Sequence, residues 1–190
     1  MTTDAFQIVN MNAGDQQKSY QWYQKQVQGL GITSNYGNQL MRNKKLVKTI
    51  VPGQMYLFLY DPKHKDKLPY YDTLPLVLPF SLLPDGFLGI NLHYLPYLAR
   101  FKLLGELNKI VINQNTPERT RIRLSWELLN SSSKYLAATA CVKHYLNDHI
   151  KTNFLKIDFN DWKTAAMLPI ERFKGASKEK IWQETSKGYR

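Results

Sequence analysis

The sequence has one cysteine, Cys141, and no run of hydrophobic residues long enough to cross a bilayer. A single thiol excludes an intrachain disulfide and a cysteine-rich zinc cluster, so nothing indicates an oxidising compartment. The most hydrophobic segment, Leu74 to Leu83, is interrupted by Pro75 and Pro79. It is also shorter than the ~18 consecutive apolar residues that indicate a transmembrane helix. The first residues, MTTDAFQIVNMN, also lack the basic and apolar regions of a secretory signal. We therefore expect no membrane partner.

Acidic residues are scarce relative to basic ones. The 190 residues include 26 Lys and Arg but 15 Asp and Glu, which gives a formal net charge of +11. This surplus favours an anionic partner, either nucleic acid or an acidic protein surface. Hydrophobic residues make up 43% and charged residues 22% of the chain, values typical of a folded globular protein.

Composition divides the chain into three regions. Residues 1–48 are rich in Gln, Asn and Lys and predict a helical arm, with an amphipathic helix from Gln16 to Leu30 and a short one from Asn38 to Lys45. Residues 49–96 predict a β-meander, and residues 97–190 predict a helical region. The expected fold class is α+β, with a small central antiparallel, barrel-like sheet flanked by N-terminal and C-terminal helices.

The central region is set apart by its prolines. It holds seven of the nine prolines in the chain. A proline in the interior of a helix costs about 3 kcal/mol, so this region is not expected to be helical. Strands are expected over Gln54–Tyr60, Leu74–Leu83 and Phe87–Tyr94, with a tight turn at Pro84-Asp85-Gly86. We expect Gly86 to need a left-handed backbone, so that Gly86→Val is destabilising, whereas Gly175→Ala in a later connector is tolerated.

Helical spacing dominates the third region. Hydrophobic residues recur at three- and four-residue steps in five segments, and we predict helices over residues 98–110, from Pro117, over 135–149, from Asn160 to before Pro169, and from Ser177 to about Lys187. Cys141 falls within the third of these helices and is expected to be buried.

Catalytic signatures are sparse. His144 and His149 are five residues apart on a predicted helix, a spacing that does not place them on one face, and His64 and His93 have no partner with metal-ligand spacing. No phosphate-binding glycine loop occurs. Asp66, Asp72 and Asp85 are typical turn residues, although their convergence on a cation stays an open alternative. We therefore expect no catalytic residues, no metal and no cofactor.

Clustered basic residues are the stronger signal. Phosphate contacts require Lys and Arg side chains, and an acidic protein neighbour would use the same ones. The candidate contacts to nucleic acid or an acidic partner are Arg42, Lys44, Lys45, Lys48, Lys63, Lys65, Arg119 and Arg123. Tyrosines bury a large area and keep a polar tip, so they suit interfaces between proteins. The candidate interface tyrosines are Tyr20, Tyr23, Tyr56, Tyr70 and Tyr71, with Tyr60 and Tyr94 also expected on the exposed sheet.

The central region also carries a family resemblance. Two stretches within Gly53 to Arg100, GQMYLFLYDPKHKDKLPYYDTLPLVLPF and DGFLGINLHYLPYLAR, resemble virion proteins of large contractile-tailed bacteriophages, known as DNA end protectors or simply as structural proteins. The resemblance implies a virion component more strongly than it implies which one. The predicted flanking helices are not part of it.

We interpret the chain as a non-enzymatic structural component of such a virion, made in the host cytoplasm. It is expected to dock to other virion proteins, with sequence-independent contact to double-stranded DNA as an option. Two alternatives stay open. The first is a baseplate or tail assembly component without DNA contact, and the second is a DNA-processing enzyme or nuclease. Magnesium-dependent cleavage of linear DNA would distinguish the enzyme from the structural protein.

Overall fold

The computed structural model describes residues 46–111, 116–137 and 140–187. The predicted N-terminal helices lie outside this part of the chain. Its strands are β1 (Leu46–Val47), β2 (Met55–Leu57), β3 (Tyr71–Asp72), β4 (Leu76–Leu83), β5 (Gly86–Asn91), β6 (Val142–Leu146), β7 (Phe154–Ile157) and β8 (Phe173–Lys174). Its helices are α4 (Tyr97–Val111), α5 (Glu118–Ala137), α6 (Trp162–Met167) and α7 (Lys178–Lys187), with short 3-10 turns η1 (Leu92–Tyr94), η2 (Asn147–His149) and η3 (Phe159–Asp161).

Six strands form an antiparallel sheet in the order β1-β7-β2-β4-β5-β6, and β3 pairs separately with β8. The predicted α+β class is therefore confirmed. The sheet is open, with β1 and β6 at its edges, so the expected barrel-like closure is not seen in the described residues. Strands β6 and β7 come from the region predicted to be helical, so the sheet draws on both the central and the C-terminal regions.

The β4–β5 hairpin follows the sequence prediction closely. Leu83 pairs with Gly86 across the tight turn, and the register shifts between Pro79 and Ser81. A proline cannot donate to a strand ladder, so an irregularity beside Pro79 is the expected consequence.

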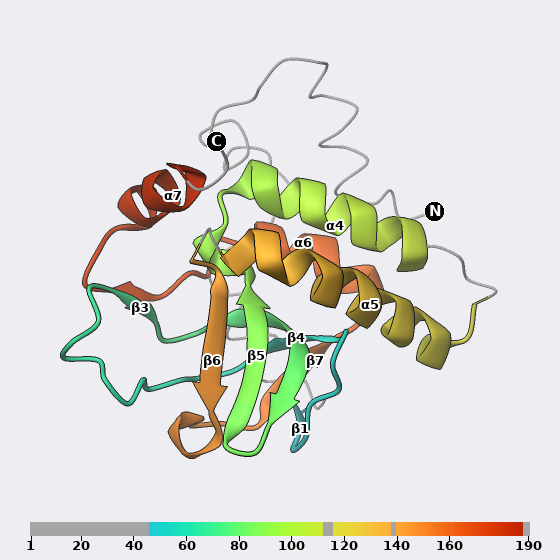
Figure 1. Cartoon of the computed structure of the whole chain (residues 1–190), viewed down its shortest axis with the longest axis horizontal. Coiled ribbons are helices and arrows are strands. Elements are labelled where there is room, and N and C mark those ends of the chain that lie inside the picture. Colours follow the sequence, from blue (N-terminus) through green and yellow to red (C-terminus); the bar gives the residue numbers. More distant parts are fainter. Residues whose placement is uncertain (1–45, 112–115, 138–139, 188–190) are drawn as a thin grey trace.

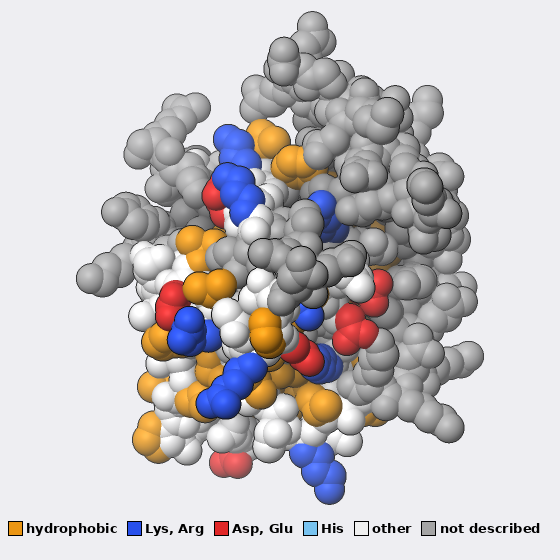
Figure 2. All heavy atoms as spheres, turned by 90° about the vertical axis from the view of Figure 1, so that its right-hand side faces the viewer, with side chains coloured by type: hydrophobic (Ala, Val, Ile, Leu, Met, Phe, Trp, Pro, Cys, Tyr) orange, Lys and Arg blue, Asp and Glu red, His pale blue; other side chains and the backbone are white. Residues whose placement is uncertain are grey.

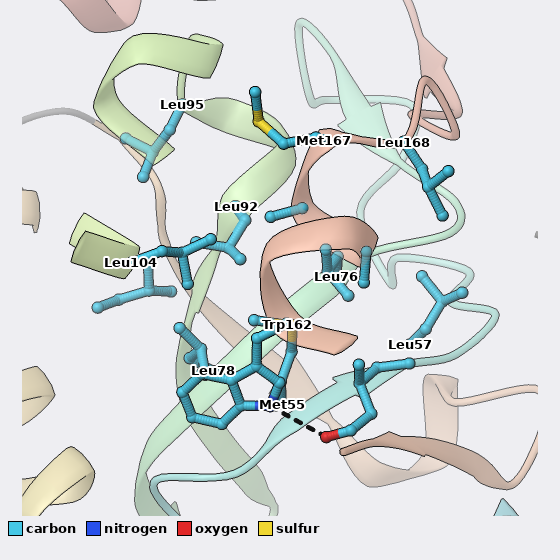
Figure 3. Close-up of a cluster of buried hydrophobic side chains, with 14 of the residues drawn as sticks. Met55, Leu57, Leu76, Leu78, Leu92, Leu95, Leu104, Trp162, Met167 and Leu168 are labelled. Atoms are coloured by element: carbon cyan, nitrogen blue, oxygen red, sulfur yellow. Dashed lines mark hydrogen bonds between the residues drawn. The ribbon is translucent and has the colours of Figure 1, made fainter. Parts of the chain in front are cut away.

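The two faces of the sheet bury different side chains. Helix α4 packs against both α5 and α6, and these helices cover one face (Figure 1). Met55 and Leu57 of β2 point into the hydrophobic cluster beneath the helices, where Trp162 lies between sheet and helix and donates its indole N–H to the Ile157 carbonyl at 3.0 Å (Figure 3). The alternate residues of this segment, Tyr56 and Phe58, belong to a second cluster on the opposite face. This alternation is the two-residue period of a strand buried on both faces.

The second cluster is largely aromatic. Phe58 is fully buried, and its ring meets the rings of Tyr60, Phe87, Tyr145 and Phe154 edge-on, with centroids 5.1 to 6.3 Å apart. Edge-to-face pairs add attraction beyond the buried area itself. The expectation that Tyr56, Tyr60 and Tyr94 are exposed is wrong, since each is at least nine-tenths buried.

The predicted helix over residues 135–149 is wrong. Helix α5 is described as far as Ala137, and Val142–Leu146 forms β6, which pairs with β5 along its whole length. Val142 and Tyr145 favour extended backbone, and the position beside β5 supplies the backbone partners. Cys141 is buried, as expected, but just before this strand. The other four predicted helices of this region are confirmed as α4, α5, α6 and α7.

Arg100 on α4 is a fully buried cation whose hydrogen bonds join distant segments. Its guanidinium donates to the carbonyl oxygens of Leu95 at 2.7 Å, Ala166 at 2.8 Å and His93 at 3.1 Å, and to Glu171 Oε1 at 2.7 Å. A buried charge is tolerated when its donors are satisfied in this way. The contacts tie α4 to η1, to α6 and to the segment before β8.

Two glycine positions show where the turn predictions need correction. Gly86 does not have positive φ, but a Cβ there would lie 1.9 Å from the Tyr145 carbonyl oxygen, so close strand approach rather than backbone handedness requires glycine. Gly175 has φ of +88°, and a Cβ would lie 2.4 Å from the Pro69 carbonyl oxygen. The expected tolerance of Gly175→Ala is therefore not supported.

We predict that Gly175→Ala destabilises the protein by about 1 to 3 kcal/mol because of backbone strain and the close carbonyl. Gly105→Ala is the matched control, since Gly105 lies in α4 and a Cβ at this position would meet no neighbouring atom within 4 Å. It should instead stabilise by about 0.5 to 1 kcal/mol through helix propensity. Urea unfolding of both variants measures the difference, and equal midpoints would contradict the account.

Acid sensitivity should follow from Glu171. Burial alone would raise its pKa, but the charge of Arg100, with contributions from His93 and Lys178, holds this pKa below the ordinary value of 4.5. A carboxylate whose pKa is lower in the folded state than in the unfolded state stabilises the fold when the pH is above the unfolded-state pKa. This stabilisation is lost as the pH falls through the pKa of the folded state. We expect the free energy of unfolding to fall as the pH drops below 4.5.

Glu171→Gln tests this assignment. The variant should lose about 3 to 5 kcal/mol at pH 7, because Arg100 keeps its buried charge without a carboxylate. Its stability should then change less between about pH 4.5 and pH 2.5 than that of the wild type, as measured by urea unfolding at each pH. If the variant loses as much stability as the wild type over this pH range, other carboxylates govern the acid response.

Candidate nucleic-acid interface

The predicted basic contacts occupy separate places on the surface. Lys48, Lys63, Lys65, Arg119 and Arg123 are all exposed, whereas Arg42, Lys44 and Lys45 lie outside the described residues. Lys48, Lys63 and the Arg119–Arg123 pair each border a different hollow. Lys65 forms an ion pair with Asp61, in which Nζ lies 3.0 Å from Oδ1. The described residues therefore supply several basic sites rather than one converged cluster.

Arg119 and Arg123 lie one turn apart near the beginning of α5, as predicted. They border a hollow of about 640 Å³, which we call the α5 groove and which is lined by Pro52, Arg119, Thr120, Ile122, Arg123 and Trp126. The Arg123 guanidinium lies 3.7 Å from Glu127 Oε1, with both side chains largely exposed. Its other donors are therefore available to an incoming anion.

Trp126 gives the α5 groove an aromatic wall. Its indole N–H donates to the Phe80 carbonyl at 2.6 Å, which fixes the ring against β4, while 37% of the residue stays exposed. Figure 2 views the side on which α5 begins, and there the Lys and Arg side chains are interspersed with hydrophobic and acidic ones. Cations beside an exposed, fixed ring suit a partner that has both charge and a flat apolar surface.

A second hollow, of about 290 Å³, lies beside the edge strand β6, between this strand, β3 and the last residue of β5. We call it the tyrosine cleft. It is lined by Tyr60, Pro62, Lys63, His64, Leu68, Tyr70, Tyr71, Asp72, Asn91, Tyr94, Lys143, His144, Tyr145 and Leu146. The lining residues combine five tyrosines with two lysines and two histidines, while Asp72 is its carboxylate.

Asp72 is fully engaged by protein groups. Its Oδ1 accepts from the Leu74 amide at 3.0 Å, and its Oδ2 accepts from Asn91 Nδ2 at 3.1 Å and lies 2.7 Å from His93 Nδ1. Burial would raise its pKa, but the contacts with His93, Asn91 and the Leu74 amide lower it overall. Asp72 therefore stays ionised and anchors the floor of the cleft rather than serving as a free base.

Lys143 of β6 places a cation in the tyrosine cleft. Its ammonium lies 4.2 Å from the centroid of the Tyr94 ring, and burial lowers its pKa. Within the described residues no carboxylate pairs with it. At the rim, His144 Nε2 lies 3.1 Å from Asp85 Oδ1. The cleft thus holds a partly desolvated amine beside aromatic walls.

The candidate interface tyrosines have different surroundings. Tyr56 is a core residue, 2% exposed, whose hydroxyl accepts from the Val51 amide, so it is not available to a partner. Tyr70 and Tyr71 are partly exposed at the tyrosine cleft, and burial with a hydrogen bond to Glu184 raises the pKa of Tyr70 to about 12. Tyr20 and Tyr23 lie outside the described residues.

Sequence reasoning missed Lys143 and Tyr145 as parts of a site, because residues 135–149 were expected to be helical. The run Val142 to Leu146 does contain a β-branched and an aromatic residue, which is the signal that favours a strand.

The structure does not bring Asp66, Asp72 and Asp85 together into a cation site. Asp72 is paired with His93 and Asp85 with His144, and in the part of the chain that the structure describes no three His, Cys, Asp or Glu side chains are grouped to hold a metal ion. Among the same residues, no helix combines the length and hydrophobicity needed to cross a membrane.

Comparison with known proteins identifies a family. The family described as Phage T4 terminal DNA protecting protein matches residues 5–186, well beyond the central stretches that carry the resemblance in the sequence. No curated protein and no solved structure shows a significant match. Because the match spans nearly the whole chain, this protein belongs to the phage T4 terminal DNA protecting protein family.

Proposed function

We propose that this protein binds the ends of double-stranded DNA without sequence preference and shields them, as a non-enzymatic component of a phage particle. The family description supports the DNA end as the partner, and the net charge of +11 supports attraction to a polyanion. The observation that carries the proposal is the α5 groove, where two exposed arginines lie beside a fixed, partly exposed tryptophan.

The chemistry of the α5 groove suits the end of a duplex. Side chains four residues apart on a helix lie roughly 5 to 6 Å apart at their Cβ atoms, so Arg119 and Arg123 can engage neighbouring phosphates of one strand. Arginine presents a planar fork of donors that matches phosphate oxygens. The interior of a duplex hides its base faces, but a terminal pair exposes one, and an aromatic ring such as Trp126 can stack on it.

Docking to other virion proteins is the second part of the proposal. Lys48 borders a third hollow, whose lining includes Leu82, a residue that is 58% exposed. Leu46 and Val51 are also large hydrophobic residues with exposed surface. Apolar side chains of this kind beside a lysine suit an acidic protein neighbour in the particle.

The test of DNA binding replaces both arginines of the α5 groove. For the wild-type chain we expect tighter binding to a linear duplex than to a covalently closed circle of the same sequence. Arg119→Ala with Arg123→Ala should weaken linear-duplex binding and lower the slope of log K against log salt by about two, because two phosphate contacts are lost. Fluorescence anisotropy across a salt series measures both quantities.

A charge-matched control separates the groove from bulk charge. Lys174→Ala with Lys180→Ala changes two exposed lysines and brings the net charge from +11 to about +9, as the arginine pair does. This control should change the salt slope much less. Equal effects of the two double variants would mean diffuse attraction, and equal wild-type affinity for linear and circular DNA would refute end binding.

A further inference from the structure

We propose that the tyrosine cleft holds a single nucleotide at the end of a DNA strand, with its phosphate on Lys143 and its base against the tyrosine walls. This inference rests on the proposed function and adds to it a separate site that takes one terminal nucleotide rather than the duplex.

The size of the cleft favours a single nucleotide. Its volume of about 290 Å³ is close to the lower end of ordinary small-molecule sites, which begin near about 300 Å³. A duplex is far too wide for it, so a nucleotide would enter only where it has left the base stack. A terminal nucleotide unpairs at lower cost than an internal one, because it has one stacking neighbour instead of two.

The walls of the cleft suit a base. Tyr70 and Tyr71 are partly exposed at the cleft, and the Tyr70 and Tyr94 rings lie 6.0 Å apart. The hydroxyl of Tyr70 is held by Glu184 at 2.9 Å, which fixes its ring. Base contact with aromatic rings does not depend on sequence, since every base has a π-face.

The charges around the cleft suit a phosphate. Lys143 has a partly buried ammonium with a ring as its neighbour and no carboxylate partner in the described residues. Lys63 and His64 add basic groups at the rim, and His144 already has Asp85. Asp72 is the opposing charge, and the two lysines of the lining, Lys63 and Lys143, outnumber it.

The position of Lys143 is set by the fold. It lies on β6 opposite Gly89 of β5, and Tyr94 follows β5 in η1. The Lys143 backbone is therefore held by the pairing of β6 with β5, and Tyr94 lies in η1, which directly follows β5. An ordered cation loses little freedom when it binds an anion, which favours tight recognition.

The experiment uses the full chain with dAMP as the probe and Lys143→Met as the variant. Methionine keeps an unbranched apolar stem but removes the charge. Titration calorimetry should show saturable dAMP binding to the wild type, weakened about tenfold or more in the variant because a charge-assisted contact is lost. Lys143→Arg should restore much of the affinity, and thermal unfolding should confirm that each variant is folded.

Competition distinguishes a free nucleotide from a strand end. If the cleft holds a terminal nucleotide, dAMP should compete with a linear duplex carrying 5′-phosphates, and Lys143→Met should lower the preference for linear over circular DNA. Binding of dAMP without competition would overturn the assignment to strand ends. Absence of saturable dAMP binding would overturn the nucleotide site altogether.

Two further outcomes separate this inference from the proposed function. If the wild type binds dAMP through Lys143 but binds no linear DNA, end binding fails while the nucleotide site stands. If Lys143→Met leaves dAMP and DNA binding unchanged but blocks incorporation into particles, the cleft receives an acidic protein segment, and the inference is wrong.

Discussion

The buried Arg100 organises the structure around it. Its donors are taken up by three backbone carbonyls and Glu171, and its guanidinium lies near the rings of Tyr97 and Trp182, 4.7 and 5.3 Å from their centroids. The carbonyl of His93 accepts from Arg100 and also from the Trp182 indole at 2.8 Å. Because His93 and Tyr94 share η1, the ion pair beneath the helices also sets the position of one wall of the tyrosine cleft. A buried, satisfied charge fixes geometry in a way that apolar packing alone does not.

The aromatic side of the sheet links stability to the candidate site. Tyr60 and Tyr145 belong to the cluster around Phe58, and both also line the tyrosine cleft. Their rings are 4.9 Å apart, and the Tyr60 hydroxyl accepts from the Leu146 amide at 3.2 Å. The inner wall of the cleft is thus an extension of a packed core, so its shape is retained without a ligand. The α5 groove has a comparable origin, since Trp126 is fixed by the carbonyl of Phe80 in β4.

The sequence predicts local structure in this chain better than it predicts the site. Helix α7 begins after Ser177, whose hydroxyl accepts from the Lys180 amide at 3.3 Å, and the hairpin at Asp85 follows from turn residues. Such signals lie within a few residues of one another. Strand β6 could not be recognised in this way, because its partner β5 precedes it by about fifty positions, and hydrophobic spacing around Val142 also fits a helix. The approach of Lys143 to Tyr94 depends on the pairing of β6 with β5, so this part of the tyrosine cleft could not be predicted from spacing.

The position of β7 has a consequence for how the chain acquires its structure. Leu155 pairs with Leu46 on one side and with Leu57 on the other, so a late segment separates two early strands. Contacts between residues so far apart in sequence form slowly, because a long loop must close before they bring any stabilisation. During synthesis, β1 and the edge of β2 that faces away from β4 therefore lack their partner strand until the segment around residue 155 has left the ribosome. Nascent chains that end before this point expose strand edges, and these are the intermediates on which a chaperone would act.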